Sequence, residues 1–175
     1  MDEDHPADRT LLDLHRRFQQ GFATEAAVYG TILVSGLIAV SSAHGETSLQ
    51  VLVAVAVTVL VFWGSHVYAG TLSRIGGAEG QQSRVRPAFE ASLRHSFGML
   101  SSALVPCVFL VIGVTRLVPD ELANNLALWA GIIVLLLLGY IAFLRRGSGF
   151  WIRILGALGT ASFGLVFVVL KGALH

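Results

Sequence analysis

Apolar residues dominate five long segments of this chain, and most charged residues fall between them. The segments cover residues 26–43, 49–70, 97–117, 123–144 and 151–172. Crossing the hydrocarbon layer of a membrane takes roughly 20 apolar helical residues, because each residue adds about 1.5 Å. Buried helices of a soluble protein are the alternative, but they keep a polar face, and Val51–Phe62 and Ile132–Leu138 have almost none. The pattern predicts an all-α fold, a polytopic membrane helix bundle with five transmembrane helices.

The composition supports this prediction. Of the 175 residues, 54% are hydrophobic and 13% are charged, whereas about 25% of the residues in a soluble domain are charged. The mean hydropathy is +0.72. The acidic start, Met1–Asp4, lacks the basic residues of a cleavable signal, so we expect none. The single cysteine, Cys107, lies in mid-span, where we expect a small buried hydrophobe and neither an internal disulfide nor a cysteine metal site.

Three segments outside the spans have patterns of their own. Residues 1–8 are acidic, and we predict a disordered tail. Residues 9–24 predict an N-terminal interfacial amphipathic helix, because apolar residues recur at helical spacing from Leu11 to Phe22. A solvated helix packed on a cytoplasmic loop is the alternative. Residues 71–96 are predicted to form the one sizeable loop, on the cytoplasmic side. The last part of this loop is predicted to be an amphipathic helix that leads into the third span.

The basic residues are distributed unevenly between the two sides of the predicted bundle. Lysines and arginines of short loops stay on the cytoplasmic side. With the N-terminus inside, ten of the 12 basic residues fall on that side: Arg9, Arg16, Arg17, Arg74, Arg84, Arg86, Arg94, Arg145, Arg146 and Arg153. Arg116 and Lys171 fall outside. The asymmetry predicts a multi-pass membrane protein with a cytoplasmic N-terminus and an extracytoplasmic C-terminus.

Few ionisable groups lie within or next to the spans, and such groups are functional candidates because they are costly in a membrane. Glu25 and Tyr29 begin the first span, and His66 lies near the inner end of the second, with Trp63 on its face. His95 leads into the third span. The predicted topology places all of them at the cytoplasmic end, so we predict a polar or proton-handling site there. The alternative for His66 is a neutral imidazole that makes one hydrogen bond to a neighbouring helix.

Small residues recur at four-residue spacing in the last two spans. Gly156, Thr160 and Gly164 form such a register in the fifth span. Small residues allow close helix approach where lipid supplies no hydrophobic drive, so we predict a packing face. The sequence leaves open whether that face meets a helix of the same chain or of another protomer. Thr31 and Ser35 start a hydroxyl stripe in the first span, which either lines a polar path or packs at a helix contact.

Most catalytic and cofactor chemistry is unsupported by the sequence. It contains no phosphate-cradling glycine loop, no HExxH zinc motif and no defensible Ser-His-Asp order. We therefore predict no catalytic residues, no metal site, no cofactor and no enzyme activity. Haem held between His66 and His95 would need imidazoles at matched depth, and we expect His95 nearer the water. The expected partners are the lipid bilayer and a second copy or another membrane protein, not nucleic acid.

Three segments carry a resemblance to known proteins: Tyr29–Ser35 (YGTILVS), Val61–Ala69 (VFWGSHVYA) and Gly164–Lys171 (GLVFVVLK). Together they resemble a family of small, uncharacterised five-span membrane proteins of actinobacteria. The resemblance covers most of the chain beyond residue 24 and implies a plasma-membrane location but no activity. The topology is also similar to that of vacuolar iron transporter-type proteins. This chain departs from them in having two methionines and no glutamate-rich loop helices, so no residue role is transferred.

Two functions are compatible with these observations. The first is passage of a small ion or solute, perhaps linked to protons, with His66, Glu25 and Tyr29 at an inner gate. The second is a non-transporting scaffold or regulatory subunit that binds a partner through small-residue helix faces. A hydrated cavity that reaches His66 would favour the first function, and a solid bundle would favour the second.

Overall fold

The computed structural model describes residues 25–76 and 85–174, and these residues form five long helices without a strand. The helices are α2 (Glu25–Ala43), α3 (Ser48–Gly76), α4 (Val85–Val114), α5 (Asp120–Arg145) and α6 (Phe150–Leu174). Each is long and apolar enough to cross a membrane. The chain is therefore a multi-pass integral membrane protein with an all-helical fold. The predicted tail at 1–8 and interfacial helix at 9–24 lie outside the described residues.

Helical structure extends beyond the predicted spans on one side of the bundle. Helix α3 continues to Gly76 and α4 starts at Val85, so helix covers most of the segment 71–96 that was predicted as a loop. The reason is that hydropathy detects the part of a helix that lies in hydrocarbon, whereas backbone hydrogen bonding continues into water. At about 1.5 Å per residue, α3 and α4 are each roughly 44 Å long, longer than the hydrocarbon layer of about 30 Å.

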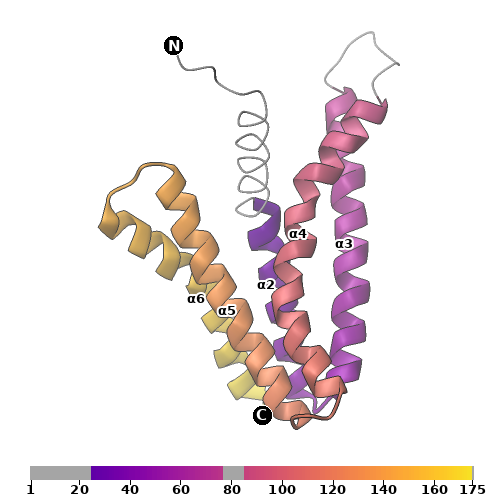
Figure 1. Ribbon diagram of the computed structural model, residues 1–175, viewed down its shortest axis with the longest axis vertical. Helices are drawn as coiled ribbons and strands as arrows, with labels where there is room; N and C mark the ends of the chain where they lie inside the picture. Colours follow the sequence, from indigo (N-terminus) through magenta and orange to yellow (C-terminus); the bar gives the residue numbers. More distant parts are fainter. Residues whose placement is uncertain (1–24, 77–84, 175) are drawn as a thin grey trace, which may run out of the picture.

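Two helical hairpins and one central helix make up the bundle. Helices α3 and α4 form the first hairpin and α5 and α6 the second, while α2 packs against all four. Figure 1 shows the hairpins close together near the C-terminus and diverging toward the opposite end, where α3 and α4 continue past the start of α2. The α3–α4 hairpin thus projects from the five-helix bundle.

The centre of the bundle is filled by apolar side chains from four helices. The buried cluster draws on α2, α3, α4 and α5 and contains Val34, Ile38, Ala39, Val51, Val55, Val59, Ala103, Leu110, Ala127 and Leu128. The hydroxyl stripe of α2 lies in this dry region. Thr31 donates to the carbonyl of Ala27 at 2.8 Å, and the Oγ of Ser35 lies against Gly131 of α5. Of the two readings of the stripe, this geometry supports a helix contact.

The small-residue register of α6 lies against α5 of the same chain. A Cβ atom on Gly164 would stand 2.7 Å from Cγ1 of Ile132, and one on Gly156 would run into the ring of Phe143. A Cβ atom on Gly139 would in turn meet Gly156 and Thr160. The two helices therefore approach at a distance that only glycine permits at these positions.

Three hydrogen bonds connect loops and helix ends at the end of the bundle near the C-terminus. Asp120, at the start of α5, accepts a hydrogen bond from the backbone N–H of Ser48, the first residue of α3, at 3.0 Å. Asn124 donates to the carbonyl of Glu46 at 3.2 Å, and Lys171 of α6 donates to Asn125 of α5 at 2.5 Å. The bond to Ser48 satisfies an N–H at a helix start, where no intrahelical partner exists.

Asp120→Ala should lower the thermal unfolding midpoint, because it removes this cap from α3. We expect a decrease of roughly 2–5 °C, as for the loss of one helix cap in a chain of this size. Asp120→Asn keeps an acceptor oxygen and should retain most of the stability. Thermal unfolding in mild detergent measures both, and equal decreases for the two variants would show that the charge matters and the cap does not.

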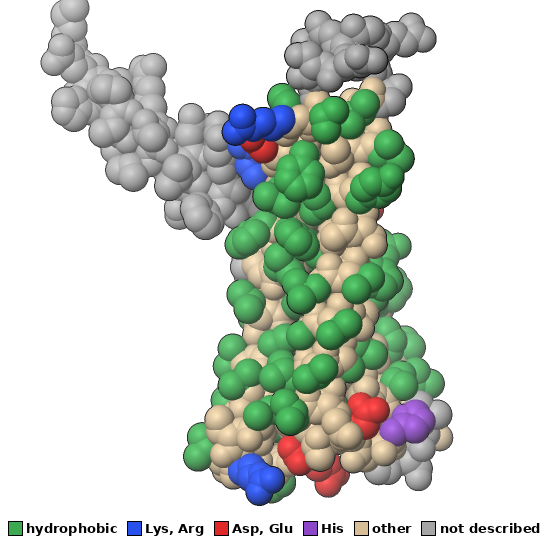
Figure 2. All heavy atoms as spheres, turned by 90° about the vertical axis from the view of Figure 1, so that its right-hand side faces the viewer, with side chains coloured by type: hydrophobic (Ala, Val, Ile, Leu, Met, Phe, Trp, Pro, Cys, Tyr) green, Lys and Arg blue, Asp and Glu red, His purple; other side chains and the backbone are tan. Residues whose placement is uncertain are grey.

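Charges are sorted between the two ends of the bundle. The end at which α3 and α5 finish carries six arginines and two carboxylates, Glu25 and Glu90, and is called the basic end below; the arginines are Arg74, Arg86, Arg94, Arg145, Arg146 and Arg153. The other end carries the carboxylates Glu46, Asp120 and Glu121 with the cations Arg116 and Lys171. The face in Figure 2 is apolar between the charged ends, as expected for a surface that contacts lipid.

Candidate functional site

A hollow of about 530 Å³ opens on the projecting part of the α3–α4 hairpin, toward the basic end. Its lining comes from more than two turns of α3 and little more than one turn of α4, and is unusually polar for this chain: His66, Ala69, Gly70, Ser73, Arg74, Ser92, His95 and Ser96. On α3, positions 66, 70 and 74 share one face because they are four residues apart, as are positions 92 and 96 on α4. The antiparallel pairing of the two helices places these faces opposite each other.

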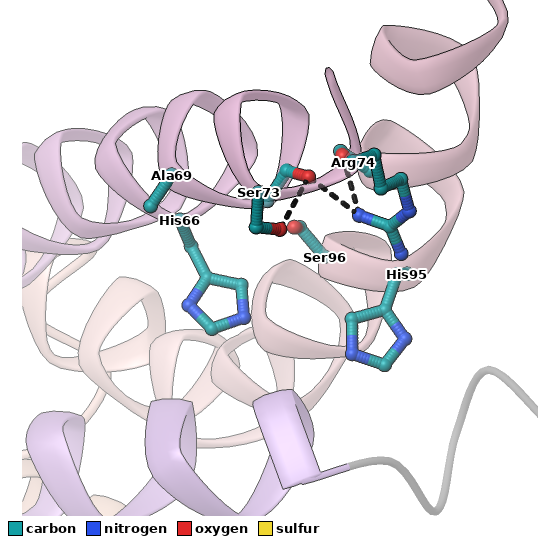
Figure 3. A pocket seen from close by; sticks show the side chains of 8 residues that line it. His66, Ala69, Ser73, Arg74, His95 and Ser96 are labelled. Carbon is teal, nitrogen blue, oxygen red and sulfur yellow. Dashed lines mark hydrogen bonds between the residues drawn. The ribbon is translucent and has the colours of Figure 1, made fainter. Parts of the chain in front are cut away.

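His66 and His95 form a pair at the deep end of this hollow. Their ring centroids are 6.3 Å apart and the ring planes are nearly parallel, at 16°. His66 lies about 27 Å along α3 from Ser48, and His95 about 28 Å along α4 from Val114. The two imidazoles therefore share one depth, where the sequence analysis expected His95 nearer the water. Figure 3 shows both rings on the same side of the hairpin.

Arg74 closes the opposite end of the hollow and is held in place by two hydrogen bonds. Its Nη1 donates to the carbonyl of Gly70 at 2.9 Å and to the Oγ of Ser92 at 2.7 Å (Figure 3). Ser92 is buried between the helices, with 1% of its surface exposed. A Cβ on Gly70 would stand 3.1 Å from both Arg74 Nη1 and Ser92 Oγ. Gly70 thus leaves the room in which the guanidinium reaches across to α4.

Ser96 lies between the imidazoles and Arg74 and has an unsatisfied hydroxyl. Its side chain is 1% exposed, and its Oγ has no hydrogen-bond partner among the described residues. A buried polar atom without a partner costs free energy, of the order of 1–3 kcal/mol. Such an atom beside a hollow indicates that something else completes its hydrogen bonding there.

Glu25 and Tyr29, which were predicted to share a site with His66, do not line the hollow. Helix α2 meets α4 lower down, where Ser102 donates to the carbonyl of Ala27 at 3.0 Å. Gly30 of α2 also lies against Met99 of α4, and counting back from these two contacts gives Glu25 and His95 a similar depth. Tyr29 is 63% exposed. The structure therefore brings His66 and His95 together and leaves Glu25 and Tyr29 outside the lining.

Trp63 lies one turn below His66 and is half buried. Its Nε1 is buried and has no hydrogen-bond partner among the described residues. It does not line the hollow. Sequence reasoning had placed it on the face of His66, and the structure adds no polar contact between the two.

Sequence reasoning did not single out Arg74, Ser92 and Ser96, because they fall in the segment 71–96, which was predicted as a cytoplasmic loop with an amphipathic helix leading into the third span. Continuing the helical register of His66 by one and two turns leads to Gly70 and Arg74, and continuing that of His95 leads to Ser92. The amphipathic start of the third span was the available signal. No group of three or more histidine, cysteine, aspartate or glutamate side chains suited to a metal ion occurs within residues 25–76 and 85–174.

The fold and the hollow define a polytopic α-helical membrane protein with a polar site on one projecting hairpin. Comparisons with protein-family models, with curated proteins and with solved structures gave no match. The function is therefore argued below from the geometry of this chain alone.

Proposed function

We propose that the protein is a non-transporting membrane module without enzymatic activity, which acts through the α3–α4 hairpin at its basic end. The observation that carries this proposal is the position of the polar hollow. It lies on the exposed hairpin, and its imidazoles and guanidinium are exposed. The distribution of arginines supports an orientation in which the hairpin faces the cytoplasm and the N-terminus is inside, and we propose the plasma membrane as the location, as the resemblance implies.

The interior of the bundle supports this reading. Between the hollow and the opposite end, the helices are filled by apolar residues such as Ile38, Val55 and Leu110, each 0% exposed. Two of the buried hydroxyls in this region, those of Thr31 and Ser102, donate to backbone carbonyls. In the described residues, the buried charged side chain is Lys171, which lies at the opposite end. A permeation path would need a continuous row of polar groups along this interior.

Passage of a small ion or solute is the second candidate function. One observation favours it: Ser35, buried in the centre of the bundle, has an Oγ without a partner among the described residues.

Partner binding through small-residue faces is less favoured than the sequence indicated, because the register of Gly156, Thr160 and Gly164 is used against α5.

Flux measurements in liposomes test the proposal. Purified protein reconstituted into vesicles that contain a pH dye, or a dye for K⁺, Na⁺ or Cl⁻, should pass these ions no faster than protein-free vesicles, because apolar side chains fill the interior of the described helices. Ionophores provide the positive control. A flux that depends on protein and is lost in His66→Gln, while the variant keeps its thermal unfolding midpoint, would contradict the proposal and support transport.

A further inference from the structure

The hollow of the α3–α4 hairpin is a site of hydrogen-bond donors, and its lining within the described residues includes no carboxylate. Its polar groups are a guanidinium, two imidazoles and three hydroxyls: Arg74, His66, His95, Ser73, Ser92 and Ser96. A guanidinium has five N–H donors and no acceptor, and a neutral imidazole keeps one N–H in either tautomer. A site of this kind fits a ligand that is negatively charged and rich in acceptor oxygens.

Two of the hydroxyls are arranged so that they can donate to such a ligand. The Oγ of Ser92 already accepts the hydrogen bond from Arg74 at 2.7 Å, which leaves its proton for another acceptor. The Oγ of Ser96 is buried and has no partner in the described part of the chain. The Nη1 of Arg74 donates hydrogen bonds to Gly70 and Ser92, so the guanidinium is already in position before any ligand binds.

We propose that this hollow binds a phosphate group, with Arg74 as the charged donor, Ser92 and Ser96 as hydroxyl donors, and the His66–His95 pair at its deep end. Guanidinium groups bind phosphate through paired N–H donors that match the spacing of its oxygens. The tetrahedral oxygens of a phosphate reach donors on several sides at once. A carboxylate, with two oxygens in one plane, would leave part of this donor set unused.

A metal ion between the two imidazoles is the competing reading, because 6.3 Å is a separation that two ring nitrogens can bridge through one ion. The charge of the hollow disfavours it. Arg74 adds a positive charge, no carboxylate lines the hollow, and no third histidine, cysteine or acidic ligand joins the pair in the described residues. An anion gains from this charge, whereas a cation is repelled.

The depth of the hollow indicates where the phosphate comes from. His66 lies about 27 Å along α3 from Ser48 and Arg74 about 39 Å, so the hollow spans the boundary of a hydrocarbon layer of about 30 Å. Lipid phosphates lie just beyond that boundary. The lipid headgroup is thus the favoured source and free phosphate the second. This proposal rests on the proposed function, because it names the ligand of the same hairpin. Its test measures ligand binding and not ion flux, so the two proposals can fail independently.

Binding to the full chain in neutral detergent tests the inference by native mass spectrometry. The probes are dioctanoyl phosphatidic acid, dioctanoylglycerol, which has the same chains without the phosphate, and inorganic phosphate. Phosphatidic acid should bind saturably and about tenfold or more tightly than dioctanoylglycerol, because the charge-assisted bonds to the phosphate are absent from the latter. If inorganic phosphate binds as tightly as phosphatidic acid, the site takes free phosphate and the phosphate chemistry stands. Equal binding of the two lipids overturns the inference.

Matched variants separate a built site from general attraction to a basic surface. Arg74→Gln should weaken phosphatidic acid binding about tenfold or more, whereas Arg86→Gln should change it less than about twofold. Arg86 lies on the same hairpin, is 90% exposed and pairs with Glu90. Ser96→Ala, which keeps the charge, should weaken binding severalfold, and Ser65→Ala, outside the hollow, should not. Equal losses in Arg74→Gln and Arg86→Gln overturn the inference. Zn²⁺ binding that His66→Gln abolishes, without phosphatidic acid binding, also overturns it and favours a metal site.

Discussion

A leucine in place of Gly164 should lower the stability of the purified protein by about 1–3 kcal/mol, the usual cost of forcing extra atoms into a packed contact. The first added atom would already stand 2.7 Å from Cγ1 of Ile132 and 3.2 Å from Cδ1 of Leu135. Both belong to α5, whose side chains at this point are buried. The side chain can be accommodated only if α6 moves away from α5. Thermal unfolding in mild detergent measures the effect.

Gly159→Leu is the matched control, because it makes the same change on the same helix. Nothing lies within 4 Å of a Cβ atom at this position. Leucine is also the better helix former, so we expect no loss and a gain of up to about 1 kcal/mol. Equal losses at the two positions would show that the four-residue register does not define the contact. A larger loss at Gly159 would show that a second copy covers that face of α6.

Cysteine labelling on intact cells should give an all-or-none difference between the two ends of the bundle. In a Cys107→Ala background, Leu117→Cys should react with a membrane-impermeant thiol reagent, and Gly149→Cys should react only after the cells are permeabilised. The reason is that the end bearing Gly149 carries six arginines of the described chain, and arginine-rich ends stay in the cytoplasm.

Both positions suit the experiment on structural grounds. Leu117 is 78% exposed in the turn after α4, and a Cβ atom at Gly149 meets nothing within 4 Å. Neither substitution changes a charge, so the feature that determines the orientation is left intact. Labelling of Gly149→Cys but not Leu117→Cys on intact cells would reverse the orientation and place the hollow outside the cell. The phosphate of an outer-leaflet lipid would then be the candidate ligand.

The five membrane helices could be predicted from the sequence because their lengths are a local property. A segment that crosses hydrocarbon must satisfy its own backbone hydrogen bonds within one helix, and its length follows from the thickness of the layer. Four of the five predicted spans lie within the helices observed, and the third, 97–117, runs three residues past the end of α4. The last span is one example: the prediction of 151–172 lies within Phe150–Leu174. Helix ends outside the hydrocarbon were not determined in this way, and α3 and α4 therefore run through most of 71–96.

The candidate site was predicted in part. Topology suggested that His66 and His95 lie at the same end of the bundle, and their rings lie 6.3 Å apart in the structure, although His95 was expected nearer the water. Lateral position did not follow, so Glu25 and Tyr29 were grouped with a pair whose hollow they do not line. Arg74, Ser92 and Ser96 join that hollow because α3 and α4 continue side by side through most of 71–96. The amphipathic pattern indicated the helix before the third span, but not which of its residues face α3.

The sequence by itself determined that this protein lies in a membrane, how many membrane helices it has and how its basic residues are distributed between the two ends. The tertiary structure alone decided which face of each helix meets another helix, because in a membrane both faces are apolar. Val55 and Val57 are the same residue two positions apart, yet Val55 is 0% exposed and Val57 is 56% exposed. In a soluble protein, hydrophobic residues identify the buried face of a helix. In a membrane they do not, because hydrophobic side chains are as stable against lipid as against a neighbouring helix. Close packing therefore selects the partner of each face, as it does where Gly156 and Gly164 of α6 meet α5.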